Sequence, residues 1–369
     1  MPVGKIRVGV VGANVRAGWG GRAHLPAILG LPEYELRAVC TAHPETAQES
    51  ARHFGAPLAF HDYAQMAQHP EIDLVSVAVR APLHHAVVMA ALEAGKHVFC
   101  EWPLGANTAE AQEMASLAQR TGVRTMVGLQ ARAAPPLVYL KELVEEGYLG
   151  QVIAVHMTML LPGGARRRAS GAWAADRRTG TGALAISGGH ALDALCFCLG
   201  EFQEVSALVT TQVKQWHLTD TQETIPVTTP DNVLVNGMLQ GGAVVSVHVG
   251  SVPWHGSGWR LEVFGTEGSL LATSSQMFQL ADAIELWGAK GTSRNLEKLT
   301  IPERFTWVPE TVPAGPAFNV AQMFRRLAEA IQQSREIEAN FATALRRHRL
   351  LDLLDRSSDV GRRLSSEEP

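Results

Sequence analysis

The sequence predicts a two-domain α/β protein. A doubly wound parallel sheet comes first, followed by a C-terminal α/β domain with a large, open, mainly antiparallel sheet. The length of 369 residues suits two domains of about 150 residues or more. Up to about residue 130, continuous apolar runs alternate with helical stretches, and beyond it longer strand-like segments are separated by glycine turns. We therefore expect domains at 1–130 and 131–369, with a C-terminal helix that could pack back on the first domain.

The first 130 residues contain apolar runs that do not alternate with polar residues. Such runs are typical of parallel strands covered on both faces. The expected strands are 6–11, 35–40, 72–79, 97–100 and 125–129. The expected helices between them are 24–29, 44–54, 84–94 and 107–121.

The rest of the chain predicts a helix at 136–147 and then a sheet built from hairpins. Strand-like stretches cover 151–161, 204–213, 232–239, 243–250, 259–264 and 269–273. Turns such as Gly241-Gly242 suit antiparallel connections between them. Residues 317–361 predict two helices and 365–369 a frayed tail, whereas 274–316 show no clear pattern.

Composition and charge exclude several classes of protein. The chain is 46% hydrophobic and 18% charged, which rules out a mainly disordered protein. Its net charge of −4 argues against a nucleic-acid partner. No apolar window of about 18 residues predicts a membrane span, and no apolar leader predicts secretion, so we expect a cytoplasmic protein without a membrane partner.

The four cysteines do not predict a metal site. Cys40 and Cys100 stand alone, and Cys196 and Cys198 are too close together for ordinary zinc spacing. We expect all four to be small, buried, apolar groups in a reducing compartment.

A glycine-rich turn, Gly12–Gly21, follows the first expected strand. A turn in this place can present backbone N–H groups and a helix N-terminus to a dinucleotide pyrophosphate, as in a Rossmann domain. The pattern departs from G-x-G-x-x-G, because Asn14 stands at the second glycine and the turn is long. Since Asn tolerates a positive φ better than other side chains, we expect the conformation to survive. The candidates here are Gly12, Asn14, Gly18 and Trp19; a structural loop that has lost its nucleotide is the alternative.

The end of the second strand bears on the choice between NAD and NADP. NAD enzymes usually carry an acid there, which binds the ribose 2′-hydroxyl and would repel a 2′-phosphate. This chain has Thr41 and His43 instead. Thr41 could donate a hydrogen bond, and His43 or Arg16 could supply positive charge. The cofactor is therefore NADP or NAD, with a slight preference for NADP.

Several motifs in order resemble those of the Gfo/Idh/MocA oxidoreductase family. The segment Gly95–Leu104 (GKHVFCEWPL) resembles its GKHV-x-x-EKP signature. Gly147–Gly150 resembles its entry into the second-domain sheet, and Gly180–Leu184 and Gly188–Asp193 resemble its glycine-rich segment and active-site histidine helix. The family implies a nucleotide-binding first domain, an active site between the domains, and hydride transfer between nicotinamide and a sugar-like secondary alcohol.

One branch of the family is more similar, that of the fungal galactose-pathway co-repressor and its bacterial relatives. The features that indicate it are Gly18-Trp19, Glu101-Trp102, the segment Leu129–Arg132 and Thr229–Asp231. In the family the C-domain sheet often forms a dimer interface, so the resemblance implies a homodimer or homotetramer.

The resemblance also implies a degenerate catalytic set. In most of the family the Lys of EKP and an Asp and a His four residues apart share the proton transfer. Here Trp102 stands at the Lys position and Ile186 at the Asp position, while His190 is retained. Neither Trp nor Ile exchanges a proton at neutral pH. The catalytic candidates are His190, Glu101 and Trp102. His190 could equally be a core histidine, and Trp102 could either stack on a ligand or pack between domains.

Further candidates follow from position. His84 and Pro103 match places beside the cofactor in the family, and Glu101, Gln130 and Arg132 complete the expected cofactor-side set. Arg132 could bind a carboxylate or phosphate, or form a surface salt bridge. Asp193 could assist His190 or be structural.

Two groups of side chains could recognise a sugar-like or anionic ligand. Arg166–Arg168 and Arg177-Arg178 flank Trp173, and the alternative for them is a solvated surface. Trp254, His255 and Trp259 could stack on sugar faces or fill an interface.

Two functions are compatible with these residues. The first is an NAD(P)-dependent oxidoreductase that acts on a sugar or polyol. The alternative is a non-catalytic NAD(P)-binding sensor or regulator, which the loss of the Lys and Asp would favour.

Overall fold

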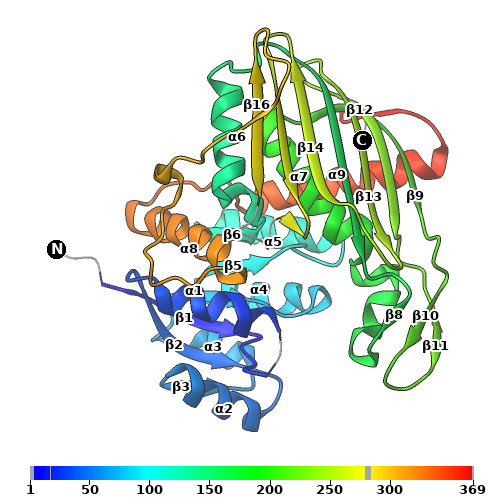
Figure 1. The fold of residues 1–369 in the computed structure, drawn as a ribbon. Coiled ribbons are helices and arrows are strands. Elements are labelled where there is room, and N and C mark those ends of the chain that lie inside the picture. Colours follow the sequence, from blue (N-terminus) through cyan, green and yellow to red (C-terminus); the bar gives the residue numbers. More distant parts are fainter. Residues whose placement is uncertain (1–3, 17, 279–283, 368–369) are drawn as a thin grey trace. The chain divides into compact units, whose positions relative to one another are not determined.

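The computed structural model describes residues 4–16, 18–278 and 284–367, and the chain forms two compact units (Figure 1). The first unit contains the residues up to Ala133 together with Thr306–Arg346. The second contains Ala134–Phe305 and the residues from Arg347 onward. The chain thus returns to its first unit before it ends in the second.

The first unit is built on a six-stranded parallel sheet with the order β3-β2-β1-β4-β5-β6. Its strands are β1 (Ile6–Val11), β2 (Tyr34–Cys40), β3 (Leu58–Phe60), β4 (Leu74–Val77), β5 (His97–Glu101) and β6 (Thr125–Gly128). Its longer helices are α1 (Leu25–Gly30), α2 (Pro44–Phe54), α3 (Tyr63–Gln68), α4 (His84–Glu93), α5 (Thr108–Thr121) and α8 (Pro316–Gln333). Short helical turns are η1 (Gly20–His24), η2 (Ala81–Leu83) and η3 (Gln130–Ala133). The strand order reverses between β1 and β4, the place where doubly wound sheets bind ligands.

Helices cover both faces of this sheet. Val8 and Val10 of β1 belong to the apolar cluster that includes α1 and α8. Gly9 points to the opposite face, where a Cβ on it would lie 2.9 Å from the sulfur of Met66 on α3. Because successive residues of a strand face opposite sides, β1 is buried on both. The predicted doubly wound sheet is confirmed.

The second unit is built on a nine-stranded sheet with the order β17-β16-β15-β14-β7-β13-β12-β9-β18. Its strands are β7 (Val152–Pro162), β9 (Phe202–Thr210), β12 (Asn232–Leu239), β13 (Val244–Val252), β14 (Gly258–Gly265), β15 (Gly268–Ser274), β16 (Glu285–Lys290), β17 (Glu297–Lys298) and β18 (Leu364–Ser365). All neighbours pair antiparallel except β13 and β7. The predicted open, mainly antiparallel sheet is confirmed.

Helices and a smaller sheet complete the second unit. The helices are α6 (Pro135–Glu145), α7 (Gly189–Leu199) and α9 (Phe341–Val360), which starts in the first unit. The short helical segments are η4 (Ala169–Ala175), η5 (Arg177–Thr179), η6 (Ala183–Gly188) and η8 (Glu303–Phe305). The smaller sheet contains β8 (Arg166–Arg167), β10 (Gln215–Leu218) and β11 (Thr224–Pro226), in the order β11-β10-β8.

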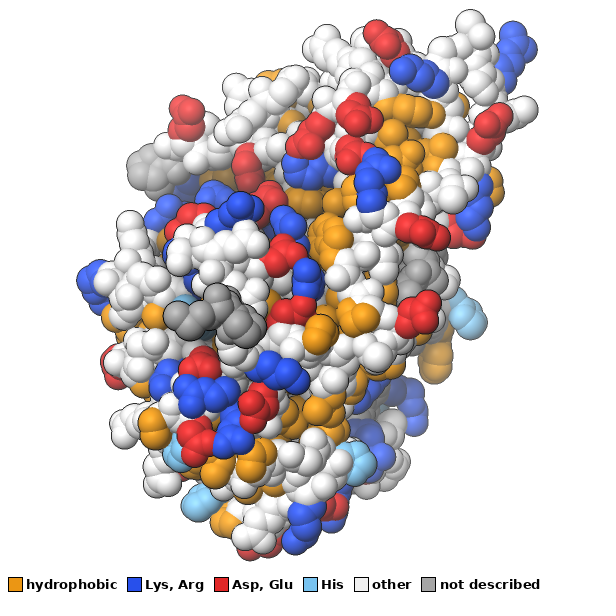
Figure 2. All heavy atoms as spheres, turned by 90° about the vertical axis from the view of Figure 1, so that its left-hand side faces the viewer, with side chains coloured by type: hydrophobic (Ala, Val, Ile, Leu, Met, Phe, Trp, Pro, Cys, Tyr) orange, Lys and Arg blue, Asp and Glu red, His pale blue; other side chains and the backbone are white. Residues whose placement is uncertain are grey.

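One face of the large sheet leaves apolar side chains exposed. Phe264, Val244, Leu234 and Leu208 lie on β14, β13, β12 and β9, and each is between 41% and 58% exposed. Leu234 and Leu208 are direct cross-strand partners. On the face of the molecule in Figure 2, hydrophobic side chains likewise lie in patches between charged ones.

The C-terminal end of the described chain is not the frayed tail that we expected. Leu364 and Ser365 pair with Val205 and Glu204, and the N–H of Ser366 donates to the carbonyl of Gln203. The prediction was wrong here because the edge of β9 offers unpaired backbone groups that composition alone does not reveal. Residues 368–369 lie outside the described part.

By length and composition, one helical stretch of the described chain, Arg177–Leu199, could cross a membrane. Its most apolar window is 72% buried within the protein, and core helices commonly have this composition.

We predict that stability decreases in mild acid because of His348 on α9. Burial lowers the pKa of His348 to about 4, from an ordinary value of 6.5. Between these values the unfolded chain binds a proton that the folded protein does not. This contribution is therefore fully present above pH 6.5 and is lost as the pH falls, by about 3 kcal/mol in total. Urea unfolding between pH 7.5 and 4.5 measures it.

A His348→Leu variant should have a smaller pH slope than the wild type, whereas His255→Leu, at an exposed position, should keep the full slope. Equal slopes for wild type and His348→Leu would contradict the lowered pKa.

Candidate functional site

The glycine turn begins at Gly12, directly after β1. Gly12 has a φ of +90°, and a Cβ on it would lie 2.4 Å from the carbonyl oxygen of Ala78, which follows β4. The N–H of Gly12 donates to the carbonyl of Cys40 at the end of β2 over 3.0 Å. Only glycine fits here, and the turn lies where the ends of β1, β2 and β4 meet.

Asn14 does not adopt the conformation that we expected of it. Positive φ occurs at Gly12 and Gly18 in this turn, and among the described non-glycine residues only at Gln222 and Ser334. The side-chain oxygen of Asn14 instead accepts the N–H of Arg16 over 2.8 Å, which folds the carboxamide back on the loop. In this longer turn the positive φ falls on Gly18 instead of on residue 14. Asn14 can therefore replace the second glycine without backbone strain.

Gly20 fills the role of the third glycine of a dinucleotide turn. A Cβ on it would lie 2.5 Å from the carbonyl oxygen of Gly12, so the first helical turn can pack on β1 only without a side chain. Trp19, just before it, packs against the apolar core of the unit. The tight turn and the close helix–strand contact are both present, and these residues therefore fit a pyrophosphate at the helix N-terminus.

The side chains after β2 are engaged within their own loop. The hydroxyl of Thr41 donates to the carbonyl of His43 over 3.0 Å and lies 2.6 Å from the hydroxyl of Thr46. His43 is exposed, and the exposed Arg16 pairs with Glu49 of α2 at 2.8 Å. The cation of Arg16 thus has a carboxylate beside it, and this loop presents no acid at the end of β2.

Glu101, at the end of β5, lies in a polar network. One carboxylate oxygen is 2.8 Å from Nε2 of the buried His24, whose Nδ1 is 2.7 Å from the hydroxyl of Ser76. The other oxygen accepts from the side-chain amide of Gln130 over 2.8 Å. Gly128 makes room for this carboxylate, since a Cβ there would lie 2.7 Å from its atoms. Both carboxylate oxygens of Glu101 are therefore occupied by structural contacts, one with His24 and the other with Gln130.

His24 and Ser76 were not predicted as part of this network. The signal in the sequence was Ser76, a serine inside an otherwise apolar strand. A hydroxyl group in a fully buried strand needs a hydrogen-bond partner.

His84 and Pro103 are in contact. Nδ1 of His84 lies 2.8 Å from the carbonyl oxygen of Pro103, and Nε2 lies 3.1 Å from that of Val79. Burial lowers the pKa of His84, so the ring is neutral at pH 7 and donates its one N–H to one of the two carbonyls. The Trp102–Pro103 bond is cis, and Trp102 is 5% exposed.

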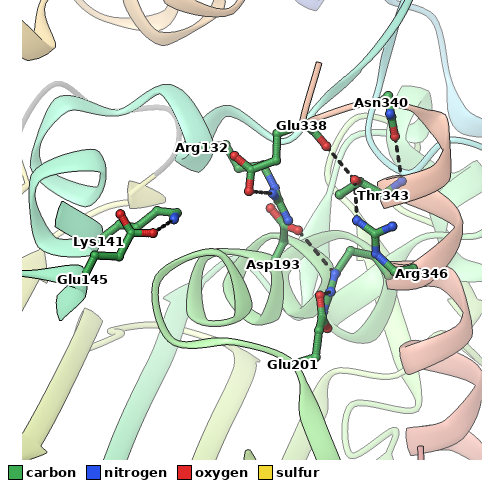
Figure 3. Close-up of polar contacts among 10 residues, drawn as sticks. Arg132, Lys141, Glu145, Asp193, Glu201, Glu338, Asn340, Thr343 and Arg346 are labelled. Atoms are coloured by element: carbon green, nitrogen blue, oxygen red, sulfur yellow. Dashed lines mark hydrogen bonds and ion pairs between the residues drawn. The ribbon is translucent and has the colours of Figure 1, made fainter. Parts of the chain in front are cut away.

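Arg132 forms an ion pair with Glu338, 3.1 Å away, and its own side chain is 7% exposed (Figure 3). Of the two roles considered for it, the structure shows the salt bridge.

His190 lies near the start of α7 and is 5% exposed. Asp193, on the same helix, is fully buried and pairs with Arg347 at 3.3 Å, while Glu201 contacts the same guanidinium (Figure 3). Arg347 also donates to the sulfur of Cys196 over 2.9 Å. Asp193 is therefore half of a buried ion pair that attaches α9 to α7.

A cavity of about 580 Å³ lies wholly within the second unit. Ile186 and Ser187 of η6 line it, and the helix that they begin continues into α7 and His190. Gly182 and Thr229 form its wall, where a Cβ on Gly182 (φ +95°) would lie 2.1 Å from the hydroxyl oxygen of Thr229. The cavity has the size of a typical small-molecule site.

Most of the arginines flanking Trp173 are paired. Arg177 pairs with Asp355 and Arg178 with Asp176, at 2.5 and 2.6 Å, and Arg168 lies 3.7 Å from Asp220. Arg166 is exposed, whereas Arg167 and Trp173 line the cavity.

The other aromatic segment is divided between surface and core. Trp254 is 73% exposed, whereas Trp259 is buried and stacked on Phe278 with ring centroids 4.4 Å apart. Among the residues that the structure covers, no three His, Cys, Asp or Glu side chains come together as a metal site, and all four cysteines are buried thiols.

We predict that Asp193→Asn lowers the free energy of unfolding by about 3 kcal/mol, because it leaves the buried Arg347 without one of its carboxylates. Urea unfolding measures the loss. Glu204→Gln, which breaks the exposed pair with Arg363, should cost under about 1 kcal/mol. If Asp193 instead assisted catalysis, the variant would lose turnover while its stability stayed unchanged.

Comparison with known proteins identifies both domains. Residues 6–129 match the family GFO_IDH_MocA, described as an oxidoreductase family with an NAD-binding Rossmann fold. Residues 135–274 match the C-terminal domain of Gal80p.

Two curated relatives are dehydrogenases. The dehydrogenase aclE of Aspergillus oryzae is 37% identical over 177 residues, which cover 47% of this chain and 48% of aclE, so the chain matches about half the length of that relative. Levoglucosan dehydrogenase of Pseudarthrobacter phenanthrenivorans is 29% identical over 289 residues, which cover 72% of this chain and 73% of the enzyme.

Solved structures share the fold over nearly the whole chain. A super-repressor mutant of Gal80p from Saccharomyces cerevisiae has a TM-score of 0.87 at 23% identity, with 99% of this chain and 100% of that one covered. A levoglucosan dehydrogenase in complex with NADH and L-sorbose has a TM-score of 0.83 at 23% identity, with 100% of both chains covered. The two family matches confirm the resemblance drawn from the motifs: the chain joins an NAD-binding Rossmann domain of the Gfo/Idh/MocA oxidoreductase family to a C-terminal domain of the Gal80p type.

Proposed function

We propose that this protein is an NAD(P)-dependent oxidoreductase that acts on a secondary alcohol of a sugar or polyol. The observation that carries the proposal is the glycine turn, in which Gly12 and Gly20 provide the tight turn and the close packing that a dinucleotide site requires. The cavity beside η6 is of the size that a monosaccharide needs.

The first unit would hold the cofactor through residues at the carboxyl ends of its strands. Gly12, Asn14, Gly18 and Trp19 form the pyrophosphate turn. The loop with Thr41 and His43 is next to the place expected for the adenosine ribose, and its lack of an acid slightly favours NADP over NAD. A solved relative has NADH bound, so both dinucleotides belong in the test.

The nicotinamide side would involve the ends of β4, β5 and β6. The buried contact between His84 and Pro103 and the network of Glu101 with Gln130 fix the backbone there. Arg132, whose side chain is fixed by the ion pair with Glu338, would orient the residues that face the cofactor. Bound NAD(P) would supply the carbon that accepts a hydride.

His190 would take the proton of the alcohol. Imidazole has an ordinary pKa near 6.5 and can act as a base at neutral pH. Ile186 and Trp102, at the family's Asp and Lys positions, cannot share the proton, so Trp102 would shape the site rather than transfer a charge. We expect slow turnover, because a missing positioned acid or base costs on the order of 10²–10⁴ in rate.

The test combines binding and turnover. Calorimetry should detect NAD or NADP, and absorbance at 340 nm should rise with a panel of sugars and polyols. His190→Asn should lower kcat by about 10²–10⁴ while dinucleotide affinity is kept. His53→Asn, at an exposed position on α2, should leave kcat unchanged. Absence of dinucleotide binding at millimolar concentration would refute the proposal.

A second function has two observations in its favour. At both altered positions, Ile186 and Trp102, the chain has no group that transfers protons, and the Gal80p fold is that of a transcriptional regulator. If dinucleotide binds with normal affinity but no sugar or polyol on the panel is oxidised, the chain would be a sensor in which cofactor shifts the population of states.

We also propose that the exposed sheet face of Phe264, Val244, Leu234 and Leu208 pairs with a second copy of the chain. Leu208 and Leu234 form one exposed apolar pair, and Val244 and Phe264, each opposite Ala154 of β7, form a second apolar group on the same face. Exposed apolar groups of this kind are costly to leave in water.

Light scattering should therefore report a dimer or tetramer for the wild type. The double variant Leu208→Glu/Leu234→Glu places two like charges in cross-strand contact on this face and should dissociate it. Leu29→Glu, equally exposed on α1, should not. A monomeric wild type would contradict the proposal.

A further inference from the structure

Arg167 differs from the other four arginines around Trp173. Arg168, Arg177 and Arg178 each lie next to a carboxylate on the surface, and Arg166 is exposed. Arg167 is half-buried and lines the cavity. No ion pair joins it to any described residue, and its buried Nε–H has no acceptor there.

Trp216 holds this guanidinium in place. Arg167 on β8 and Trp216 on β10 belong to the smaller sheet, and the guanidinium carbon lies 4.1 Å from the centroid of the indole ring. The ring is 4% exposed and belongs to a small apolar cluster with Ala175 and Val227. A cation stacked on an aromatic face is stabilised but keeps its N–H groups for other partners.

The carboxylate in the described lining of the cavity makes no ion pair with Arg167. Asp231 is the acidic residue among the described lining, and both of its carboxylate oxygens already accept hydrogen bonds from other residues. One oxygen accepts from the N–H of Gln212 and the amide of Asn232, and the other accepts from the N–H of Val213. Asp231 therefore fixes the loop that follows β9.

A half-buried cation without a carboxylate partner is energetically costly. The guanidinium of Arg167 is partly removed from water, and this burial lowers its pKa. An anion that enters the cavity would offset this cost, and the guanidinium fork suits two parallel hydrogen bonds to one oxyanion.

We propose that the substrate of this cavity carries a carboxylate group, so that it is a sugar acid rather than a neutral sugar, and that Arg167 binds this carboxylate. The inference rests on the proposed function, which it narrows to a class of substrate. Arg167 carries the single positive charge of the described lining, and the carboxylate of Asp231 in the same lining would repel a phosphate dianion more strongly than a monoanion. Elsewhere in the lining, the hydroxyl of Ser187 and the side chain of Trp173 suit the rest of a sugar.

The test measures binding of three matched probes by calorimetry, without dinucleotide and with saturating NAD or NADP. The probes are D-glucuronate, D-glucose and D-glucose 6-phosphate. We expect glucuronate to bind at least tenfold more tightly than either of the others. Arg167→Gln should weaken glucuronate binding roughly 10- to 100-fold and leave glucose binding within about twofold.

Two control variants separate recognition from general effects. Arg166→Gln removes the same charge from the exposed neighbour and should leave glucuronate affinity unchanged. Arg167→Lys keeps the charge but loses the fork, so it should have an intermediate affinity. Thermal melting establishes that each variant is folded.

The outcomes distinguish this inference from the proposed function. Glucuronate binding that depends on Arg167, without dinucleotide binding or oxidation, would support the anion site while the oxidoreductase proposal fails. Oxidation of neutral sugars that Arg167→Gln leaves unchanged would support the oxidoreductase and overturn the anion site. Tighter binding of glucose 6-phosphate than of glucuronate would overturn the carboxylate in favour of a phosphate.

Discussion

The close contact between the start of the first helical region and the end of β1 is the constraint on which the first unit depends. The carbonyl of Gly12 would be 2.5 Å from any Cβ on Gly20, and a Cβ on Gly12 would be 2.4 Å from the carbonyl of Ala78. Because two glycines allow three backbone segments to meet, the helix N-terminus is directed to the switch point of the sheet. Asn14 is compatible with this contact because its side chain is bound to the loop itself.

The buried acids of the two units hold structure rather than present free charge. Glu101 bridges His24 and Gln130 in the first unit, and Asp193 is paired with Arg347 in the second. Buried carboxylates need such partners, since an isolated one would be too costly to desolvate. With Trp102 and Ile186 at the altered family positions, His190 and Arg167 are the side chains to which we assign chemistry and recognition.

The secondary structure of the first unit could be predicted closely, because its parallel strands are continuous apolar runs with a clear period. The helix at 44–54 and the strand at 6–11 have the predicted bounds. The strand β3, which has three residues, and the helix α3, which has six, were not predicted. The motifs predicted which residues belong to the candidate site, but not how these residues contact one another. For example, nothing in the sequence of the turn reveals that Gly18, rather than Asn14, takes the positive φ.

By itself, the sequence determined the alternation of strands and helices in the first unit, the family resemblance and the replacement of two proton-transferring residues, since these depend on residue identity and local period. Only the tertiary structure decided which charged side chains are partnered. Arg132, Arg167 and Arg177 look alike in sequence, yet one meets Glu338, one Trp216 and one Asp355. Each partner lies between 49 and 206 residues away from its arginine in the sequence. Because no local pattern links positions so far apart, only the folded chain shows which guanidinium meets a carboxylate and which meets an indole ring.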